Sequence, residues 1–591
     1  MADIIRIGGA SGFWGDAPHA ARQLLDAGVD ALIFDYLAEI TMSIMARARA
    51  ADPAMGYATD FVTAAMAPNL RAIARGGVAV VSNAGGVNPP ACAAALRAEI
   101  ARQGLDLTVA CVTGDDLTAR AAEFADRVEM FSGAPFPPAA KVASINAYLG
   151  AVPIAEALRR GADVVVAGRC ADSALALGVL MHRFGWGPDD HDLLAAGSLV
   201  GHLLECGTQA TGGNFTDWRT VGDFARIGYP IAEVRPDGTA DIVLPEGCAG
   251  LVSPATVGEQ MLYEIEDPQS YALPDVICDF SGVTLTQAGP NRVRVAGARG
   301  RAPSGLLKVG ATWADGFRAG QIFAFEGRDA REKAAVFARA VEDRARAALR
   351  AMNAPDFDRI SAEISGGRVD DPPGYEEVAL KLAVRHADAR AVATYLKAAI
   401  GLALSAPPGL SMFAGARPKP SPVVRLFSFL LPAEEARARL DIGDPAPLPA
   451  PRGASDAPPP RPAPPPPPEA PAAGTAPLER LAWARSGDKG DRVNVGVIAR
   501  RPEWLPLIWA ALTEERVAEV FARFGPSRVE RFLLPGINAM NIVLHDVLEG
   551  GGVASLRADP QGKGYAQRLL AAHVPAPAEL AEAAKPREGR P

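Results

Sequence analysis

Residues 162–173 read ADVVVAGRCADS and join a run of β-branched residues to a glycine, an arginine and an aspartate. Such an apolar run is typical of a strand that is buried on both faces. Four earlier stretches have the same form: DIIRIGG (3–9), DALIFDYL (30–37), GVAVVSNAGG (77–86) and DLTVACVTGDD (106–116). Helical patterns lie between them, at 17–28, 38–50, 60–75, 89–103, 117–127 and 151–160. This alternation predicts an α/β domain with a parallel sheet over residues 1–220.

The pattern changes after residue 220. YPIAEVRPDGTADIVLP (229–245) reads as two alternating strands around Asp237-Gly238, which is a hairpin signal. GVTLTQAGPNRVRVAGARG (282–300) reads as a second strand pair, and further strand and helix patterns follow. We expect residues 221–443 to form an α+β subdomain that completes the main body.

Proline and alanine dominate residues 444–477, DPAPLPAPRGASDAPPPRPAPPPPPEAPAAGTAP. Such a stretch forms no packed core and behaves as an extended, semi-rigid linker. The order of strand and helix patterns over residues 478–575 is compatible with a ferredoxin-like α/β sandwich. We expect residues 576–591 to be a disordered tail.

The composition is that of an ordinary globular chain. It has 591 residues, 49% of them hydrophobic, with a net charge of −8 and a pI of about 5.6. An acidic chain lacks the basic face that phosphate contacts need, so we expect no nucleic-acid partner. No apolar window of about 18 residues and no signal peptide are visible, which predicts a cytoplasmic protein without membrane spans. Six scattered cysteines predict reduced thiols.

Polar loops follow all five predicted strands of residues 1–220. Ligands bind beyond the carboxyl ends of parallel strands, so these loops predict a ligand cleft. The candidate substrate-binding residues in them are Gly12, Trp14, Asp16, Asn83, Gly85, Gly86, Asn88, Asp172 and Ser173. Neither GGASGFWG (8–15) nor NAGGVNP (83–89) matches a dinucleotide or P-loop fingerprint, so no nicotinamide or flavin cofactor is expected. The loop N–H groups either hold a phosphate or carboxylate, or the glycines serve only as turns.

Four charged residues at these strand ends are the candidate catalytic residues: Asp35, Glu39, Asp115 and Arg169. Paired carboxylates perform general acid–base catalysis when one is buried and its pKa is raised. An arginine at a strand end can hold a carboxylate or a phosphate. Other interpretations stay open: the carboxylates bind magnesium, Asp115 caps a helix, or Arg169 only pairs with Asp172.

The stretch HLLECGTQATGGNFTDW (202–218) gathers many polar residues. Cys206 is disfavoured as a nucleophile, because the neighbouring Glu205 favours the protonated thiol, and a helical histidine such as His202 is commonly structural. The remaining polar and glycine residues are expected to form a loop over the cleft mouth: Thr211, Gly212, Gly213, Asn214 and Asp217.

The C-terminal domain has its own candidate site. It consists of Asp488, Lys489, Asp491, Asn541 and Arg557, near the glycine-rich turns SGDKGD (486–491) and EGGGVASLR (549–557). The cations could hold an anion such as a CoA phosphate. The alternative is a pair of charged hairpins at an interface with the main body.

Several long motifs resemble the acyclic terpene utilization AtuA family. They are GFWGD (12–16), FDYLAEITM (34–42), GYATDF (56–61), NAGGVNP (83–89), VAGRCADSALALG (166–178), HLLECGTQATGGNFTDW (202–218) and GLVSPATVGEQMLYEI (250–265). SGDKGDRVNVGVIAR (486–500) and NIVLHDVLEGGGVASLRADPQGKG (541–564) resemble the ferredoxin-fold domain that accompanies the family. The resemblance implies bacterial breakdown of citronellol- or geraniol-type terpenoids through acyl-CoA thioesters. It supplies no catalytic residue, and the chain has no biotin-carrier motif.

These observations lead to three hypotheses. The first is a non-redox enzyme, of hydro-lyase, hydrolase or isomerase type, that acts on a small carboxylate or acyl-CoA in terpenoid or branched-chain acid degradation. The second is a non-catalytic protein that binds an acyl-CoA or an enzyme of the same pathway. The third is a divalent-metal hydrolase that uses Asp35, Glu39 and Asp115. We also expect a homo-oligomer.

Overall fold

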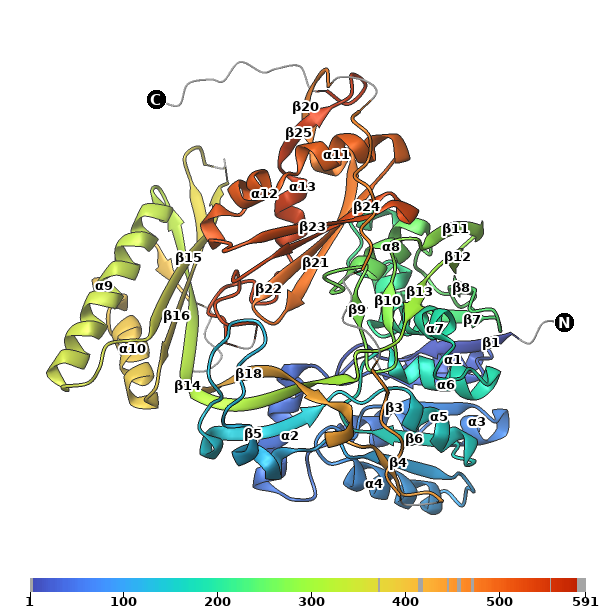
Figure 1. Ribbon diagram of the computed structural model, residues 1–591. Coiled ribbons are helices and arrows are strands. Elements are labelled where there is room, and N and C mark those ends of the chain that lie inside the picture. The colour runs from blue at the N-terminus through green and yellow to red at the C-terminus, as the bar shows by residue number, and fades with distance from the viewer. Residues whose placement is uncertain are drawn as a thin grey trace. The chain divides into compact units, whose positions relative to one another are not determined.

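The computed structural model describes residues 4–16, 18–369, 372–412, 418–443, 446–453, 459–468, 472–552 and 554–581, without the side chain of Glu39. The chain divides into two compact units (Figure 1). The first unit contains residues 1–312, 427–547 and 562–591, and the second contains 313–426 and 548–561. The chain is a mixed α/β protein with several sheets.

A ten-stranded sheet organises the first unit, in the order β11-β12-β8-β7-β1-β2-β3-β6-β4-β19. Its central strands are β1 (Ile5–Gly9), β2 (Ala31–Phe34), β3 (Ala79–Ser82), β6 (Val164–Ala167) and β4 (Val109–Thr113). These five are parallel, because each pairs in parallel with the next. They coincide with the five apolar runs in the sequence, and β2 and β6 are buried along their whole length.

Antiparallel strands extend this sheet at both edges, so it is mixed and not parallel throughout. The added strands are β7 (Ile231–Val234), β8 (Ala240–Val243), β12 (Arg292–Ala296), β11 (Thr284–Gly289) and β19 (Arg439–Leu440). The β7–β8 hairpin turns at Asp237-Gly238, where Gly238 has a φ of +82°. Residues 221–312 belong to the first unit, together with the parallel strands, whereas the sequence grouped them with residues 313–443 in one α+β subdomain that completes the main body.

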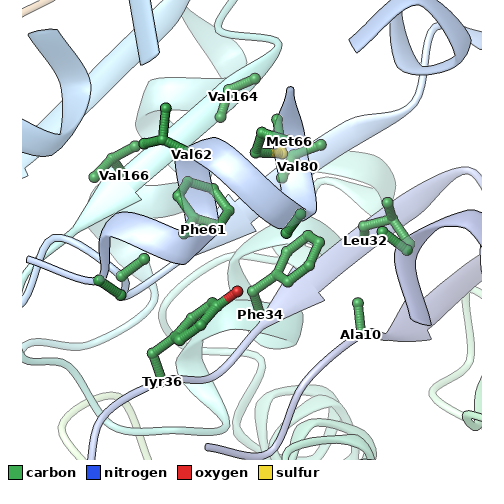
Figure 2. Packing of buried hydrophobic residues seen from close by; sticks show 14 of the residues in the cluster. Ala10, Leu32, Phe34, Tyr36, Phe61, Val62, Met66, Val80, Val164 and Val166 are labelled. Atoms are coloured by element: carbon green, nitrogen blue, oxygen red, sulfur yellow. The ribbon is translucent and has the colours of Figure 1, made fainter. Parts of the chain in front are cut away.

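Helices cover both faces of the parallel strands. They are α1 (Ala20–Asp26), α2 (Glu39–Ala51), the π-helical turn η1 (Phe61–Met66), α3 (Leu70–Gly76), α4 (Pro89–Arg102), α5 (Val152–Arg159) and α6 (Ala174–Phe184). Figure 2 shows the core on one face, where Phe61 lies against Phe34 and Tyr36 with ring centroids 5.4 and 5.9 Å apart. Val80 and Val164 complete this layer from the strands. Its aromatic contacts fix the chain immediately after β2.

Further elements of the first unit before the linker lie outside this ten-stranded sheet. They are the 3₁₀ turn η2 (Thr118–Phe124), β5 (Val142–Ala147), α7 (His191–Leu204), α8 (Pro254–Leu262), β9 (Tyr271–Ala272), β10 (Ile277–Asp279) and β13 (Arg299–Arg301). A capping box between Ser253 and Thr256, with Pro254 at the first helical position, starts α8.

The second unit is an antiparallel sheet covered by two helices. Its strands are β15 (Arg359–Arg368), β16 (Glu376–His386), β14 (Leu306–Gly327), β17 (Leu410–Ser411) and β18 (Ser421–Pro432), and its helices are α9 (Ala330–Ala351) and α10 (Ala389–Gly401). Apolar residues from both helices and from two of the strands, β14 and β16, form its buried core. β14 and β18 begin in one unit and end in the other.

Residues 548–561 also belong to the second unit, although the chain on both sides of them belongs to the first. We name this segment the strap. Arg318 donates to the Ser555 carbonyl at 2.8 Å, Lys381 donates to the Leu556 carbonyl, and Ala558 N–H donates to the Glu363 carboxylate at 2.7 Å. The strap thus supplies partners to charged side chains of β14, β15 and β16.

The C-terminal domain contains a four-stranded antiparallel sheet in the order β21-β22-β24-β23. Its elements are β21 (Ala482–Lys489), β22 (Arg492–Ala499), α11 (Leu505–Ala511), α12 (Glu514–Val520), β23 (Val529–Leu534), β24 (Ala539–Leu544) and α13 (Tyr565–Leu570). β20 (Gly474–Pro477) pairs with β25 (His573–Ala576), so the last four residues of the predicted linker form a strand. Residues 582–591 of the predicted disordered tail lie outside the described residues. Among the described residues, no helix is long and apolar enough to cross a membrane.

Candidate functional site

Asp35 and Asn83 lie together beyond the carboxyl ends of β2 and β3. Asp35 is buried, with 6% of its surface exposed. Its Oδ1 atom accepts a hydrogen bond from Asn83 Nδ2 at 2.6 Å and another from Leu37 N–H at 3.2 Å. Asn83 in turn accepts from Tyr36 N–H at 2.8 Å, which fixes the orientation of its amide. The two neighbouring parallel strands therefore hold a carboxyl group in a defined position.

Arg169 follows β6 and is buried with 4% exposure. Its Nη1 atom donates to the Leu37 carbonyl at 2.9 Å and to Asp172 Oδ1 at 2.8 Å. The guanidinium lies over the Tyr148 ring, 4.1 Å from its centroid. Arg169 thus pairs with Asp172, as one of the sequence interpretations proposed, and also brings positive charge to the residues after β2.

The electrostatic environment favours the protonated form of Asp35. Burial, followed by the charges of Asp172 and Glu205, raises its pKa well above the ordinary value. The Asn83 hydrogen bond and the Arg169 charge lower the pKa but do not compensate. A buried carboxyl group whose pKa is raised by its surroundings has the property that a general acid requires.

His202 and Glu205 form a second proton-carrying pair in the same cluster. His202 Nδ1 lies 3.0 Å from Glu205 Oε1, and both residues are buried. Nε2 lies 3.2 Å from the Met261 carbonyl, which only accepts, so Nε2 carries a hydrogen. Burial is the largest single influence and lowers the pKa of His202, but the charge and the hydrogen bond of Glu205, together with the charge of Glu264, raise the pKa above its ordinary value. The pair therefore holds one proton between ring and carboxylate.

Lys489, from the C-terminal domain, acts electrostatically on this cluster. Burial lowers its pKa, but Tyr271, Glu264, Glu266 and Asp172 together raise it above the ordinary value. The Lys489 charge in turn lowers the pKa of Glu205. The cluster thus combines residues of the main body with a lysine that the sequence had placed in a separate C-terminal site.

The backbone beside Lys489 is strained. Glu264 and Glu266 both have left-handed φ values, +61° and +52°, which side chains other than glycine, asparagine and aspartate rarely adopt. Glu264 lies 3.5 Å from Lys563, and Glu266 lies 3.1 Å from Arg492. Strained residues of this kind concentrate at functional sites, because the surrounding structure must hold them.

Asp115 is buried but has a structural environment. Its Oδ2 atom accepts from Arg169 N–H and from Asn146 Nδ2, both at 2.9 Å. Burial raises its pKa to about 6. Asp115 therefore holds the backbone that carries Arg169. The side chain of Glu39, the other carboxylate of the metal hypothesis, lies outside the described part of the chain.

Within the part of the chain that the structure describes, no three His, Cys, Asp or Glu side chains come together in a way that could hold a metal ion.

The glycine-rich loops serve close packing. A Cβ atom on Gly12 would lie 2.7 Å from the Cys206 carbonyl carbon, and one on Gly85 would lie 2.5 Å from the Ala167 oxygen. Gly86, with a φ of +56°, would place a Cβ atom 2.2 Å from the Met45 sulfur. These glycines allow the strand-end loops to approach one another, which supports the turn interpretation.

Other candidates from these loops satisfy the local structure. Trp14 Nε1 donates to Asp60 at 2.7 Å, and the Tyr229 hydroxyl donates to Asp16 at 2.5 Å. Asn88 donates to two backbone carbonyls, and Ser173 is buried at the start of α6.

The loop that contains Thr211, Gly212, Gly213, Asn214 and Asp217 contacts the C-terminal domain. Asp217 accepts two hydrogen bonds from Arg500, at 2.6 and 2.7 Å, and one from Trp483 Nε1 at 2.7 Å. The Asn214 carbonyl accepts from Arg485 at 3.3 Å. The Thr211 hydroxyl bonds to backbone carbonyls of the main body. The expected loop over the cleft mouth is therefore a docking segment.

The five residues of the predicted C-terminal site lie in different environments. Asn541 donates to the Glu266 carbonyl at 2.5 Å and exchanges hydrogen bonds with Asn494, so it joins the domain to the main body. Asp488 lies 3.8 Å from Lys563, and the Asp491 carbonyl accepts from Val547 N–H. Arg557 belongs to the strap of the second unit, where it pairs with Glu549 at 3.2 Å.

The sequence reasoning missed several members of the cluster. It treated His202 as structural, although Glu205 stands three positions later on the same helical turn, a spacing that brings side chains together. No sequence signal connected Tyr271 or Glu264 with Lys489, because these residues meet only when the C-terminal domain docks on the main body.

Comparison with protein families identifies the class of this chain. A family of acyclic terpene utilisation proteins matches residues 5–442, and the family model for its ferredoxin-like domain matches residues 476–575. The chain therefore belongs to the acyclic terpene utilisation family, AtuA. No curated protein matches it, and no solved structure does.

Proposed function

We propose that this AtuA-family protein is a non-redox enzyme that performs acid–base catalysis on a carboxylate or an acyl-CoA thioester of an acyclic branched chain. The observation that carries the proposal is the environment of Asp35. Its carboxyl group is buried and is oriented by Asn83, and burial together with the charges of Asp172 and Glu205 raises its pKa. Such a group can give a proton to a substrate and recover it.

The roles in the cluster follow from its charges. Asp35 is the general acid, and the His202–Glu205 pair holds a second proton that can move in the opposite direction. Arg169 and Lys489 provide positive charge, which favours a substrate that is anionic or develops negative charge on a carbonyl oxygen. Hydration, isomerisation and hydrolysis of an unsaturated acyl group all suit these parts. The terpenoid substrate, the cytoplasmic location and a homo-oligomeric state belong to the same proposal.

Solvent-exchange and product assays test the proposal. The purified full chain is incubated in deuterated water with CoA thioesters and free acids of short and branched acyclic chains. Mass spectrometry follows deuterium incorporation and hydration, and a thiol reagent follows CoA release. We expect turnover of at least one thioester or acid. Turnover of none, together with no shift in melting temperature, would overturn the proposal.

Binding without turnover would identify the chain as a non-catalytic binding protein of the pathway. Asp275→Asn is the matched control for Asp35, because Asp275 is also a buried aspartate, with a pKa of about 6. It accepts from Ala151 N–H at the start of α5, so its position is structural. We expect Asp275→Asn to keep activity. A Lys489→Met variant should lower the affinity for an anionic substrate about tenfold and keep the fold.

A further inference from the structure

A cleft in the first unit lies between the main body and the C-terminal domain. It has a volume of about 490 Å³. The docking loop, the start of α8 and β11 form one wall, and the strands and turns of the C-terminal domain form the other. Its lining residues differ from those of the Asp35 cluster. Ligand sites commonly lie where two domains meet and have volumes of about 300–1,000 Å³.

Apolar side chains dominate the lining. They include Phe215, Leu251, Leu285, Trp483, Ile498 and Ile537. Phe215, Ile498 and Ile537 are almost fully buried. Such a surface favours a hydrocarbon ligand, because each CH₂ group removed from water contributes about 0.8 kcal/mol.

The charges at the cleft neutralise one another. Asp217 and Arg500 both line it, and they form the bidentate pair described above. The Arg500 guanidinium also lies over the Trp483 ring, 4.8 Å from its centroid. An anionic ligand would have to compete with the Asp217 carboxylate for this guanidinium. The cleft therefore favours an uncharged ligand, and the Asn538 side chain in its lining offers a hydrogen-bonding group to it.

Hydrogen bonds fix the two walls relative to each other. The Thr216 hydroxyl donates to the Ala484 carbonyl at 3.0 Å and lies 3.1 Å from the Ala484 N–H. Gly536 N–H donates to the Ser281 carbonyl at 3.1 Å, and Arg485 donates to Gln209 at 2.5 Å. The cleft is thus formed before a ligand arrives, which reduces the ordering cost of binding.

We propose that this cleft binds an uncharged, apolar small molecule with at most one hydrogen-bonding group. Because the site spans the joint between the main body and the C-terminal domain, its ligand stabilises the docked arrangement that carries Lys489. Binding to the native state alone must then raise the melting temperature. The inference stands independently of the reaction proposed for the Asp35 cluster.

Fluorescence titration tests this site on the full chain with N-phenyl-1-naphthylamine, a neutral apolar probe. We expect saturable binding of one probe per chain, displacement by decan-1-ol, and at least tenfold weaker displacement by decanoate. Decan-1-ol should also raise the melting temperature. Absence of saturable binding, or equal displacement by decanoate, would overturn the proposal.

Variants on β11 locate the binding. Leu285→Asp places a charge in the cleft at a partly exposed position and should weaken probe binding at least tenfold. Thr284→Asp, one residue earlier and exposed, is the matched control and should change binding less than twofold. If Leu285→Asp does not fold, Ala255→Leu narrows the same cleft and should weaken binding as well. Unchanged binding in a folded Leu285→Asp or Ala255→Leu protein contradicts the assignment.

Discussion

Asp35 and Asp217 are two aspartates of the first unit with opposite environments. Asp35 accepts hydrogen bonds from an amide and a backbone N–H, lies near two other carboxylates, and has a raised pKa. Asp217 accepts three hydrogen bonds from Arg500 and Trp483, and these partners lower its pKa. A fully paired carboxylate holds domains together, whereas a buried one without a dedicated cation is available for proton transfer.

Replacing Asp35 should produce the largest effect. Asp35→Asn keeps the shape and can still accept the Asn83 hydrogen bond, but it has no transferable proton. We expect turnover in the assays above to fall about a thousandfold, with no loss of folding stability. Urea unfolding provides the stability measurement. Retained turnover would remove Asp35 from the mechanism and end the contrast with Asp217.

Glu259 extends the comparison of Asp35 with Asp217, because it is a buried carboxyl group at the interface between the main body and the C-terminal domain. It accepts from Thr216 N–H at 3.2 Å, and burial raises its pKa from 4.5 to about 8. Between these two pH values the native state binds more protons than the unfolded chain, so the free energy of unfolding falls as pH rises. Relative to the Glu259→Gln variant, the free energy of unfolding of the parent protein should fall by on the order of 3 kcal/mol between pH 5 and pH 8.5. Parallel pH profiles of the two proteins in urea unfolding would contradict this.

Breaking the paired aspartate should reduce stability. Asp217→Ala leaves the Arg500 guanidinium and the Trp483 N–H without their acceptor, and we expect a loss of about 2 kcal/mol in the free energy of unfolding. Asp189→Ala, at an exposed aspartate, is the control and should have no measurable effect. Equal losses of unfolding free energy in the two variants would show that the Asp217–Arg500 pair makes no specific contribution to stability.

The smallest expected effect on stability is at an exposed ion pair. Arg22 lies 2.7 Å from Asp26 on α1, and more than half of each side chain is exposed. Solvent screens such a pair, so Arg22→Gln should leave the urea midpoint within experimental error. A clear loss there would mean that ion pairs stabilise this protein more generally, and the Asp217 result would lose its specificity.

The sequence predicted local elements well, because local composition determines them. All five apolar runs are strands of one sheet, and the Asp237-Gly238 hairpin lies where expected. The antiparallel extension of that sheet could not be predicted, because the pairing of β7 with β1 joins residues more than 200 positions apart.

The candidate site could be predicted only in part. Asp35, Asn83 and Arg169 meet because strand order brings consecutive loops to one edge. Lys489 reaches the same cluster through domain docking, and no spacing in the sequence encodes such a contact. The docking loop was predicted to bind a ligand because its composition is polar. Its contacts with the C-terminal domain could not be predicted, because polar residues form contacts between domains equally well.

Because of the strap, the protein is difficult to divide into independently folding domains. The family match to the ferredoxin-like domain spans residues 476–575 and includes all of it. A gene fragment that ends at the linker would therefore lack the strap. The second unit would then lose the strap's hydrogen bonds to Arg318, Lys381 and Glu363, although its other residues are all present. Conversely, the isolated C-terminal fragment would carry the strap without the β14–β16 sheet that the strap contacts. Exchange of this domain between relatives by recombination should succeed only when the β14–β16 sheet is inherited with it.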